Sequence, residues 1–185
     1  MIGYVIQWIP SAIVEAQKQA KLKFWKDFEE KNGKLMQNRE LFECGIKYLE
    51  TKGIKPCSED MAKQLADLLG QITTQDKSRW TGPWLVKGHI QNKRLVSAQT
   101  ETFVTLAQIT EAGKKYVFIT QGARCELNFN GTIEPGQIKG TLGIGAKDFS
   151  VTTEITGVVV NDKISITLRQ LTEAGVVEGN LTLLR

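Results

Sequence analysis

Side chains suited to acid–base catalysis or metal binding are few in this sequence, and they are scattered along it. His89 is the only histidine, so any imidazole base would have to be this residue. No spacing in the sequence selects a nucleophile and an orienting carboxylate for it, as a catalytic triad requires. We interpret His89 as an exposed residue on a strand. An enzyme is the weaker alternative, because it would need Glu101 or Glu126 beside the imidazole.

The cysteines and the clustered glycines also favour structural roles. Cys44, Cys57 and Cys125 form no pair with the spacing of a redox motif or a zinc site. We therefore expect reduced thiols, a cytoplasmic location, no metal site and no cofactor. The glycine-rich run 140–145 lacks the helix start that must follow a phosphate loop. It predicts a strand whose backbone lies close to a neighbouring one.

The composition is that of an ordinary globular protein. The chain has 185 residues, of which 41% are hydrophobic and 24% are charged, and its formal net charge is +4. The densest basic run is a set of lysines between positions 18 and 26, and acidic residues follow it at once. We interpret this run as a solvated helix face, and the even spread of charge disfavours nucleic acid as a partner.

The first ten residues, MIGYVIQWIP, are almost wholly apolar. They lack the basic start and the cleavage site of a signal peptide, and they are shorter than the roughly 20 apolar residues that span a bilayer. We expect this segment to be a strand or helix that docks on the rest of the protein. In the alternative, residues 1–10 contact a membrane surface, because Tyr4 and Trp8 flank aliphatic side chains and lysines follow.

The first part of the chain has the pattern of three helices. Good helix formers run from Pro10 to about Lys31. A second apolar stripe predicts a helix over 35–51. A third helix is expected from Ser58, its N-cap, with acidic residues in the first turn.

From residue 80 the sequence changes to short β-rich runs separated by turn residues. Alternation is clear where Cys125, Leu127 and Phe129 share one face and polar residues occupy the other. No helical pattern interrupts the run, so consecutive hairpins most simply close into an up-and-down barrel without exposed edges. Strands are expected at 84–91, 95–109, 114–121, 124–133, 137–145, 149–160, 163–172 and 175–184.

The turns between these strands include Asn92-Lys93 and Asn161-Asp162. The predicted fold class is therefore α+β. It consists of an α-helical segment over 1–78, with about three helices, and an antiparallel up-and-down β-barrel domain over 79–185, with about eight strands.

The barrel segment begins WTGPW (80–84) and ends NLTLLR (180–185). This layout resembles that of the calycins, which include the lipocalins and the fatty-acid-binding proteins. The resemblance implies that Trp84 closes the base of the barrel, that Arg185 packs across it, and that a small molecule binds in the lumen or mouth. The preceding helices, the lack of a secretion signal and Pro83 depart from the calycin pattern.

For a ligand-binding barrel, the candidate site residues are large aromatic side chains and two arginines in mid-strand. The aromatic residues are most simply core, and the arginines lie opposite the apolar rows and are expected to face water. If the lumen instead holds an anionic ligand, an arginine would bind its carboxylate or phosphate. The candidates are Trp84, Phe103, Tyr116, Phe118, Arg124, Phe129 and Arg169.

We therefore expect a non-catalytic, intracellular barrel that binds a small molecule of unspecified class, as a sensor with a helical output or lid segment. The helices would also offer a surface for homo-oligomerisation. A filled lumen would count against this function. The alternative is an interaction module that contacts a partner protein or a membrane surface through the hydrophobic N-terminal segment.

Overall fold

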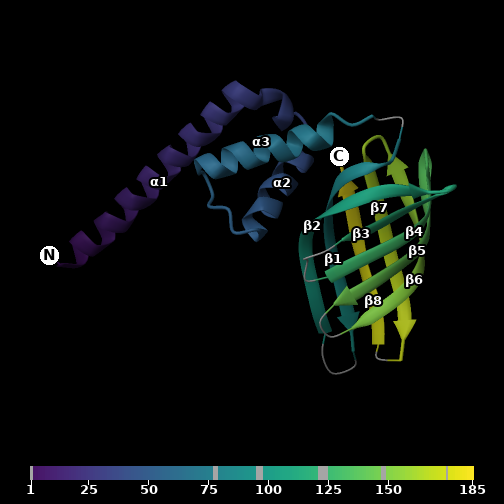
Figure 1. Ribbon diagram of the computed structural model, residues 1–185. Coiled ribbons are helices and arrows are strands. Elements are labelled where there is room, and N and C mark those ends of the chain that lie inside the picture. The colour runs from purple at the N-terminus through teal and green to yellow at the C-terminus, as the bar shows by residue number, and fades with distance from the viewer. Residues whose placement is uncertain (1, 77–78, 95–97, 121–124, 147–148, 174) are drawn as a thin grey trace.

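The computed structural model describes residues 2–76, 79–94, 98–120, 125–146, 149–173 and 175–185, without the side chains of residues 2–12 and 99. In this part of the chain, three α-helices precede eight antiparallel strands that close into one barrel (Figure 1). The predicted α+β class, with helices first and an up-and-down barrel second, is confirmed. None of the described helices is long and apolar enough to cross a membrane.

The helical segment contains α1 (Ile2–Asn32), the 3-10 helix η1 (Gly33–Met36), α2 (Arg39–Thr51) and α3 (Glu59–Thr73). Side-chain caps fix where the last two begin. The Asn38 side chain accepts a hydrogen bond from the backbone N–H of Leu41 at 3.2 Å, and the Ser58 hydroxyl accepts one from that of Met61 at 3.1 Å. The predicted N-cap at Ser58 is therefore confirmed.

Two predicted helix starts are wrong. The first helix begins at Ile2, and Pro10 lies inside it. A proline inside a helix removes its own N–H from the hydrogen-bond ladder and crowds the carbonyl group four residues earlier, yet here the helix continues on both sides of it. The second helix begins at Arg39 instead of residue 35, because Asn38 caps it and the preceding residues form η1.

Each strand pairs antiparallel with the next along the chain, and β1 also pairs with β8 from Leu85–Leu184 to Lys93–Val176. The predicted turn at Asn161 is confirmed, with a positive φ of 53°. The strands are β1 (Gly82–Lys93), β2 (Ala98–Ala112), β3 (Lys115–Thr120), β4 (Cys125–Glu134), β5 (Gly136–Ala146), β6 (Ser150–Val160), β7 (Lys163–Thr172) and β8 (Gly175–Leu184).

One end of the barrel is closed by Arg185, and we call it the capped end. The guanidinium carbon of Arg185 lies 4.6 Å from the ring centroid of Trp84 and 5.3 Å from that of Trp80. Its Nε donates to Asp162 Oδ1 at 3.1 Å, and its Nη1 donates to the carbonyl oxygen of Arg79. The expected packing of Arg185 against Trp84 is confirmed. At the opposite end, which we call the far end, the strands are joined by segments 94–97, 121–124, 147–149 and 173–174.

The protein has two hydrophobic cores. One fills the barrel interior, and the other lies between the helices and the outer wall of the barrel. Leu85 and Leu184 point outward from the wall into this second core, where α2 and α3 pack. The glycine run of β5 allows the backbones of neighbouring strands to lie close together. A Cβ on Gly140 would lie 2.5 Å from the carbonyl oxygen of Asn130. The predicted close backbone approach is confirmed.

Replacement of Arg185 tests the capped end. Arg185→Ala should lower the free energy of unfolding by about 3 kcal/mol, because it removes a buried cation and leaves Asp162 without that partner. Arg185→Lys should recover only part of the loss, since a lysine cannot stack as a planar group on the two indoles. Urea unfolding followed by circular dichroism measures both. The control is Arg169→Ala, on the outer wall, which should change stability by no more than about 0.5 kcal/mol; equal effects of the two alanine variants would contradict this account.

Candidate functional site

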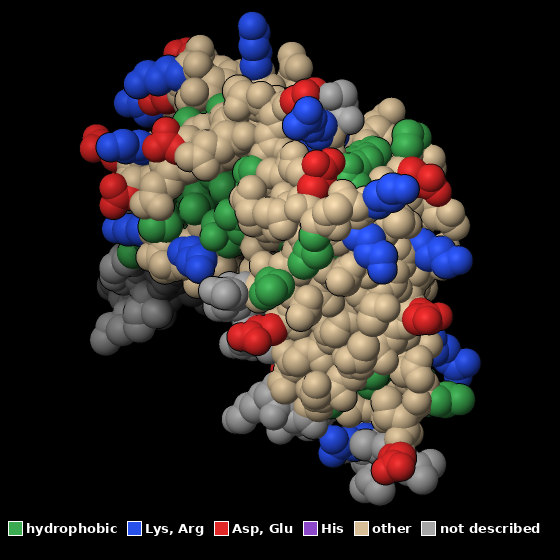
Figure 2. All heavy atoms as spheres, turned by 45° about the vertical axis from the view of Figure 1, so that its right-hand side comes forward, with side chains coloured by type: hydrophobic (Ala, Val, Ile, Leu, Met, Phe, Trp, Pro, Cys, Tyr) green, Lys and Arg blue, Asp and Glu red, His purple; other side chains and the backbone are tan. Residues whose placement is uncertain are grey.

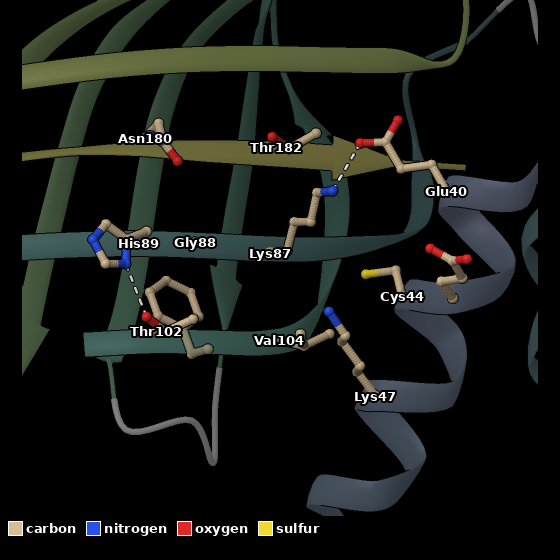
Figure 3. A pocket seen from close by; sticks show the side chains of 12 residues that line it. Glu40, Cys44, Lys47, Lys87, Gly88, His89, Thr102, Val104, Asn180 and Thr182 are labelled. Carbon is tan, nitrogen blue, oxygen red and sulfur yellow. Dashed lines mark hydrogen bonds and ion pairs between the residues drawn. The ribbon is translucent and has the colours of Figure 1, made fainter. Parts of the chain in front are cut away.

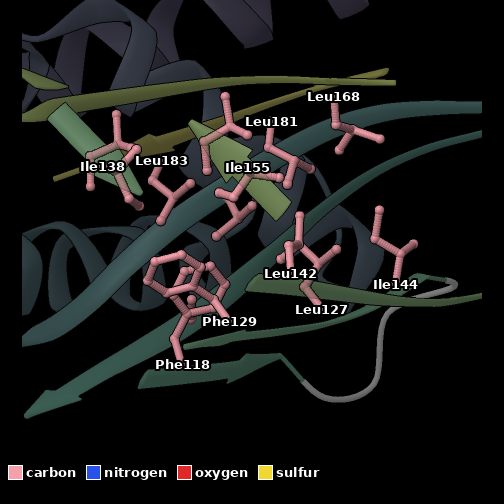
Figure 4. Packing of buried hydrophobic residues seen from close by; sticks show 14 of the residues in the cluster. Phe118, Leu127, Phe129, Ile138, Leu142, Ile144, Ile155, Leu168, Leu181 and Leu183 are labelled. Atoms are coloured by element: carbon pink, nitrogen blue, oxygen red, sulfur yellow. The ribbon is translucent and has the colours of Figure 1, made fainter. Parts of the chain in front are cut away.

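The aromatic candidates occupy the barrel interior. Trp84, Phe103, Phe118 and Phe129 are each at most 6% exposed. Phe118 and Phe129 stack with ring centroids 5.1 Å apart, among the leucines and isoleucines of the interior (Figure 4). The Phe103 ring covers Gly88, where a Cβ would come 2.3 Å from the ring. These side chains fill the space that a ligand in the middle of the lumen would need.

Of the other described candidates, Tyr116 packs against the edge of this interior and Arg169 lies on the outer wall. The Tyr116 hydroxyl donates to Glu111 Oε1 at 3.1 Å, beside the β2–β3 turn. The Arg169 side chain is 70% exposed, and its Nε lies 3.7 Å from Glu178 Oε2 on the outer wall. Its predicted water-facing position is confirmed, so a ligand in the lumen would not meet its guanidinium. Arg124 lies outside the described residues.

The far end of the interior holds an unusual polar side chain, Asn92. The sequence predicts a turn here, but β1 continues to Lys93, and the alternation that buries Val86 and Ile90 also turns Asn92 inward. Asn92 is 1% exposed, and neither its Nδ2 nor its Oδ1 has a hydrogen-bond partner among the residues that the structure describes. An amide buried in this way costs about 1–3 kcal/mol. The sequence did carry a signal for this buried position: the alternation of inward-facing residues on β1, continued two residues beyond Ile90, reaches Asn92.

Further polar side chains line the same end of the barrel. Val177 on β8 is paired with Asn92 on β1 and with Gln170 on β7, so these two amides lie two strands apart, at about 10 Å. Gln170 Oε1 accepts a hydrogen bond from Thr153 Oγ1 on β6 at 3.0 Å. Asn92, Gln170 and Thr153 thus form an arc around the far end.

The barrel wall is loosest beside this arc. The backbone ladder between β6 and β7 covers Gly157–Val160 and Lys163–Ile166, so it ends before the two strands do. Continued in the same register, it would place Thr153 opposite Gln170, and there a side-chain hydrogen bond joins the strands. A wall held by side chains opens at lower cost than one held by a continuous ladder.

The buried thiol at the far end is not activated. Burial raises the pKa of Cys125 to about 11, and the negative charge of Glu101 adds to the effect. Cys125 therefore stays protonated near neutral pH, where a thiolate would be needed for nucleophilic chemistry.

A second site lies outside the barrel, in a hollow of about 240 Å³ between α2 and the wall formed by β1, β2 and β8 (Figure 3). His89 Nδ1 lies 2.8 Å from Thr102 Oγ1, and both side chains are on the outer face. The predicted exposed position of His89 is confirmed. Across the hollow, Lys87 Nζ and Lys163 Nζ lie 2.8 and 3.0 Å from the Glu40 carboxylate.

The charges of this hollow are paired. The hydrogen bond from Lys87 lowers the pKa of Glu40, partial burial opposes the shift, and Lys163 adds to the lowering. Cys44, beside them, is 3% exposed, and burial raises its pKa to about 11. The hollow therefore presents a protonated thiol and an ion-paired carboxylate, an arrangement suited to joining α2 to the barrel and not to nucleophilic attack.

The helices form an apolar hollow of their own, of about 560 Å³, between α1, α2 and α3. Trp25, Phe42, Ile46 and Met61 line it together with acidic and basic side chains such as Glu43. Figure 2 shows hydrophobic side chains gathered over the helical part of the surface, with charged ones around them. This is the place where the expected homo-oligomerisation through the helical segment would act, and that expectation stays a prediction.

Within the described ranges, no group of three or more His, Cys, Asp or Glu side chains is arranged to hold a metal ion. The chain was also compared with protein-family models, curated proteins and solved structures, and none of them matches it. The candidate site therefore rests on this chain's own geometry.

Replacement of Glu40 tests the link between α2 and the barrel. Because the folded-state pKa of Glu40 lies below its ordinary value of 4.5, its charge stabilises the fold above that value, and the contribution is lost as the pH falls through the lowered pKa. Glu40→Gln should cost up to about 1 kcal/mol at pH 7 for this partly exposed pair, and less at pH 3. Urea unfolding at both pH values measures the difference.

The control for this substitution is Glu43→Gln on the same helix. Glu43 is 60% exposed, and Arg39 is its neighbour at 3.4 Å, one turn earlier. This exposed pair should contribute no more than about 0.5 kcal/mol. A cost of Glu40→Gln that is equal at pH 7 and pH 3 would show that the carboxylate charge does not hold α2 to the barrel.

Proposed function

We propose that this protein is a non-catalytic barrel that binds a small polar molecule at the far end of its interior, against the Asn92 side chain. The observation that carries the proposal is the buried amide of Asn92, whose donor and acceptor are both unpaired within the described part of the chain. Buried polar groups in folded proteins almost always have partners, so an unpaired amide at the end of a barrel fits a residue kept for a ligand.

The chemistry of the amide defines the ligand class. Asn92 offers N–H donors and a carbonyl acceptor side by side, so its complement is a planar edge with an adjacent acceptor and donor, such as a carboxamide, a carboxylic acid or a nucleobase edge. Gln170 and Thr153 supply further hydrogen-bonding atoms around the same end. Phe118 and Phe129 fill the interior beyond, which counts against a ligand in the middle of the lumen, so the proposed ligand is small and lies near the end.

The positions of the reactive side chains support binding over catalysis. His89 lies on the outer face of β1, on the side of the wall opposite Asn92. Cys125 is a protonated thiol near neutral pH because burial raises its pKa to about 11. An imidazole base would therefore act across the barrel wall from a ligand held by Asn92.

The test combines native mass spectrometry of the purified protein with the substitution Asn92→Leu. The wild type should retain a small-molecule mass that denaturation releases, and Asn92→Leu should retain none. In the ligand-free state the variant should be more stable than the wild type by about 1–3 kcal/mol, because an apolar side chain replaces an unpaired amide. Urea unfolding of the ligand-free proteins measures this second effect.

The matched control is Thr120→Val, another polar-to-apolar change inside the barrel. Thr120 is fully buried, and its Oγ1 accepts a hydrogen bond from the backbone N–H of Leu127 at 2.8 Å. This variant should lose about 1 kcal/mol and still retain the ligand. The proposal fails if Asn92→Leu retains the same small-molecule mass as the wild type. It also fails if Asn92→Leu is destabilised as Thr120→Val is, and neither the wild type nor Asn92→Leu carries a ligand.

A further inference from the structure

The N-terminal part of α1 is apolar on almost every side. Between positions 2 and 14, Gln7 and Ser11 are the only polar side chains apart from the tyrosine hydroxyl and the tryptophan N–H. With 3.6 residues per turn, the apolar positions in this range point around most of the helix. A helix that packs on a protein partner needs only one apolar stripe, whereas a helix that is apolar all round fits a protein core or hydrocarbon.

The first part of α1 extends outward from the rest of the molecule, away from the barrel (Figure 1). Ile13, Val14 and Leu22 are 51%, 61% and 57% exposed, and the other side chains from 15 to 23 are exposed as well. Among the described side chains of α1, Phe24 and Trp25 are the first to pack against the core between the helices and the barrel, and Phe28, at 3% exposed, is the first to be buried.

Exposed charged side chains follow the apolar part: Glu15 comes first, and four lysines lie beyond it. Lys18, Lys21, Lys23 and Lys26 are all exposed, and their spacing on the helix points them to different sides. A ring of cations just beyond an apolar helix end complements the anionic headgroups of a membrane, at about 1 kcal/mol for each lysine near the surface.

The length of the apolar part determines how it meets a bilayer. Thirteen residues (2–14) of α1 extend about 20 Å at 1.5 Å per residue, whereas the hydrocarbon core is about 30 Å thick. The segment therefore enters the membrane without crossing it. Since it has no broad polar face, it enters steeply and does not lie flat in the interface.

We propose that α1 anchors this protein to an anionic membrane, with residues 2–14 inserted in the bilayer and the four lysines between 18 and 26 at the headgroups. This binding surface is separate from the far end of the barrel, and the proposal does not depend on the ligand proposed above. The barrel and the other helices then lie on one side of the membrane, beyond the lysines.

The experiment is flotation of the full chain with phosphatidylcholine vesicles, with and without phosphatidylglycerol. The wild type should float with both and bind the anionic vesicles more strongly. Ile6→Asp/Ile9→Asp should weaken binding to both by at least about tenfold, because two carboxylates oppose insertion. Lys18→Glu/Lys21→Glu should weaken binding to the anionic vesicles alone, by about tenfold or more.

The control is Lys114→Glu/Lys115→Glu, which makes the same change of net charge at the β2–β3 turn and should bind as the wild type does. Insertion is read from quenching of tryptophan fluorescence by brominated acyl chains, which Trp8→Phe should abolish. Wild type that floats no better than Ile6→Asp/Ile9→Asp overturns the proposal. If sedimentation velocity then shows an oligomer that the same variant dissociates, the apolar part of α1 belongs to a protein interface.

Discussion

The pairing of the first strand with the last is the contact on which the rest of the structure depends. It places Leu85 opposite Leu184 and Val86 opposite Leu183. Val86 and Leu183 belong to the barrel interior, whereas Leu85 and Leu184 belong to the core under the helices. Closure therefore removes the exposed sheet edges and, in the same step, builds the apolar surface on which α2 and α3 pack.

In an interior closed in this way, each polar side chain needs a hydrogen-bond partner within the barrel. Thr120 accepts a backbone N–H and Thr153 donates to Gln170, so burial costs these hydroxyls little. Asn92 differs because it is equally buried and has no partner. Interior packing alone would favour an apolar residue at this position, so Asn92 is the residue on which the proposed binding rests.

The barrel could be predicted from the sequence because it repeats a simple pattern, with residues such as Ile164 and Ile166 alternating with polar neighbours between marked turns. Asn92 escaped prediction because Asn-Lys is also turn chemistry, and only the register of β1 shows that the strand continues past it. The place where the helices pack on the barrel wall could have been predicted from the apolar run Trp84–Val86. This run breaks the alternation and is typical of a strand covered on both faces.

The start of α1 could not be predicted from local rules, since proline usually marks a first helical turn. The rest of α1 has a mechanical role that follows from its contacts. Trp25 meets Phe42 on α2 with ring centroids 5.4 Å apart, and Glu40 on the same helix binds Lys87 and Lys163 of the barrel wall. Aromatic packing and paired charges thus connect the apolar end of α1 to the barrel through α2. The helices pack beside the capped end of the barrel (Figure 1), so an anchored α1 would orient the barrel with its far end away from the helical core.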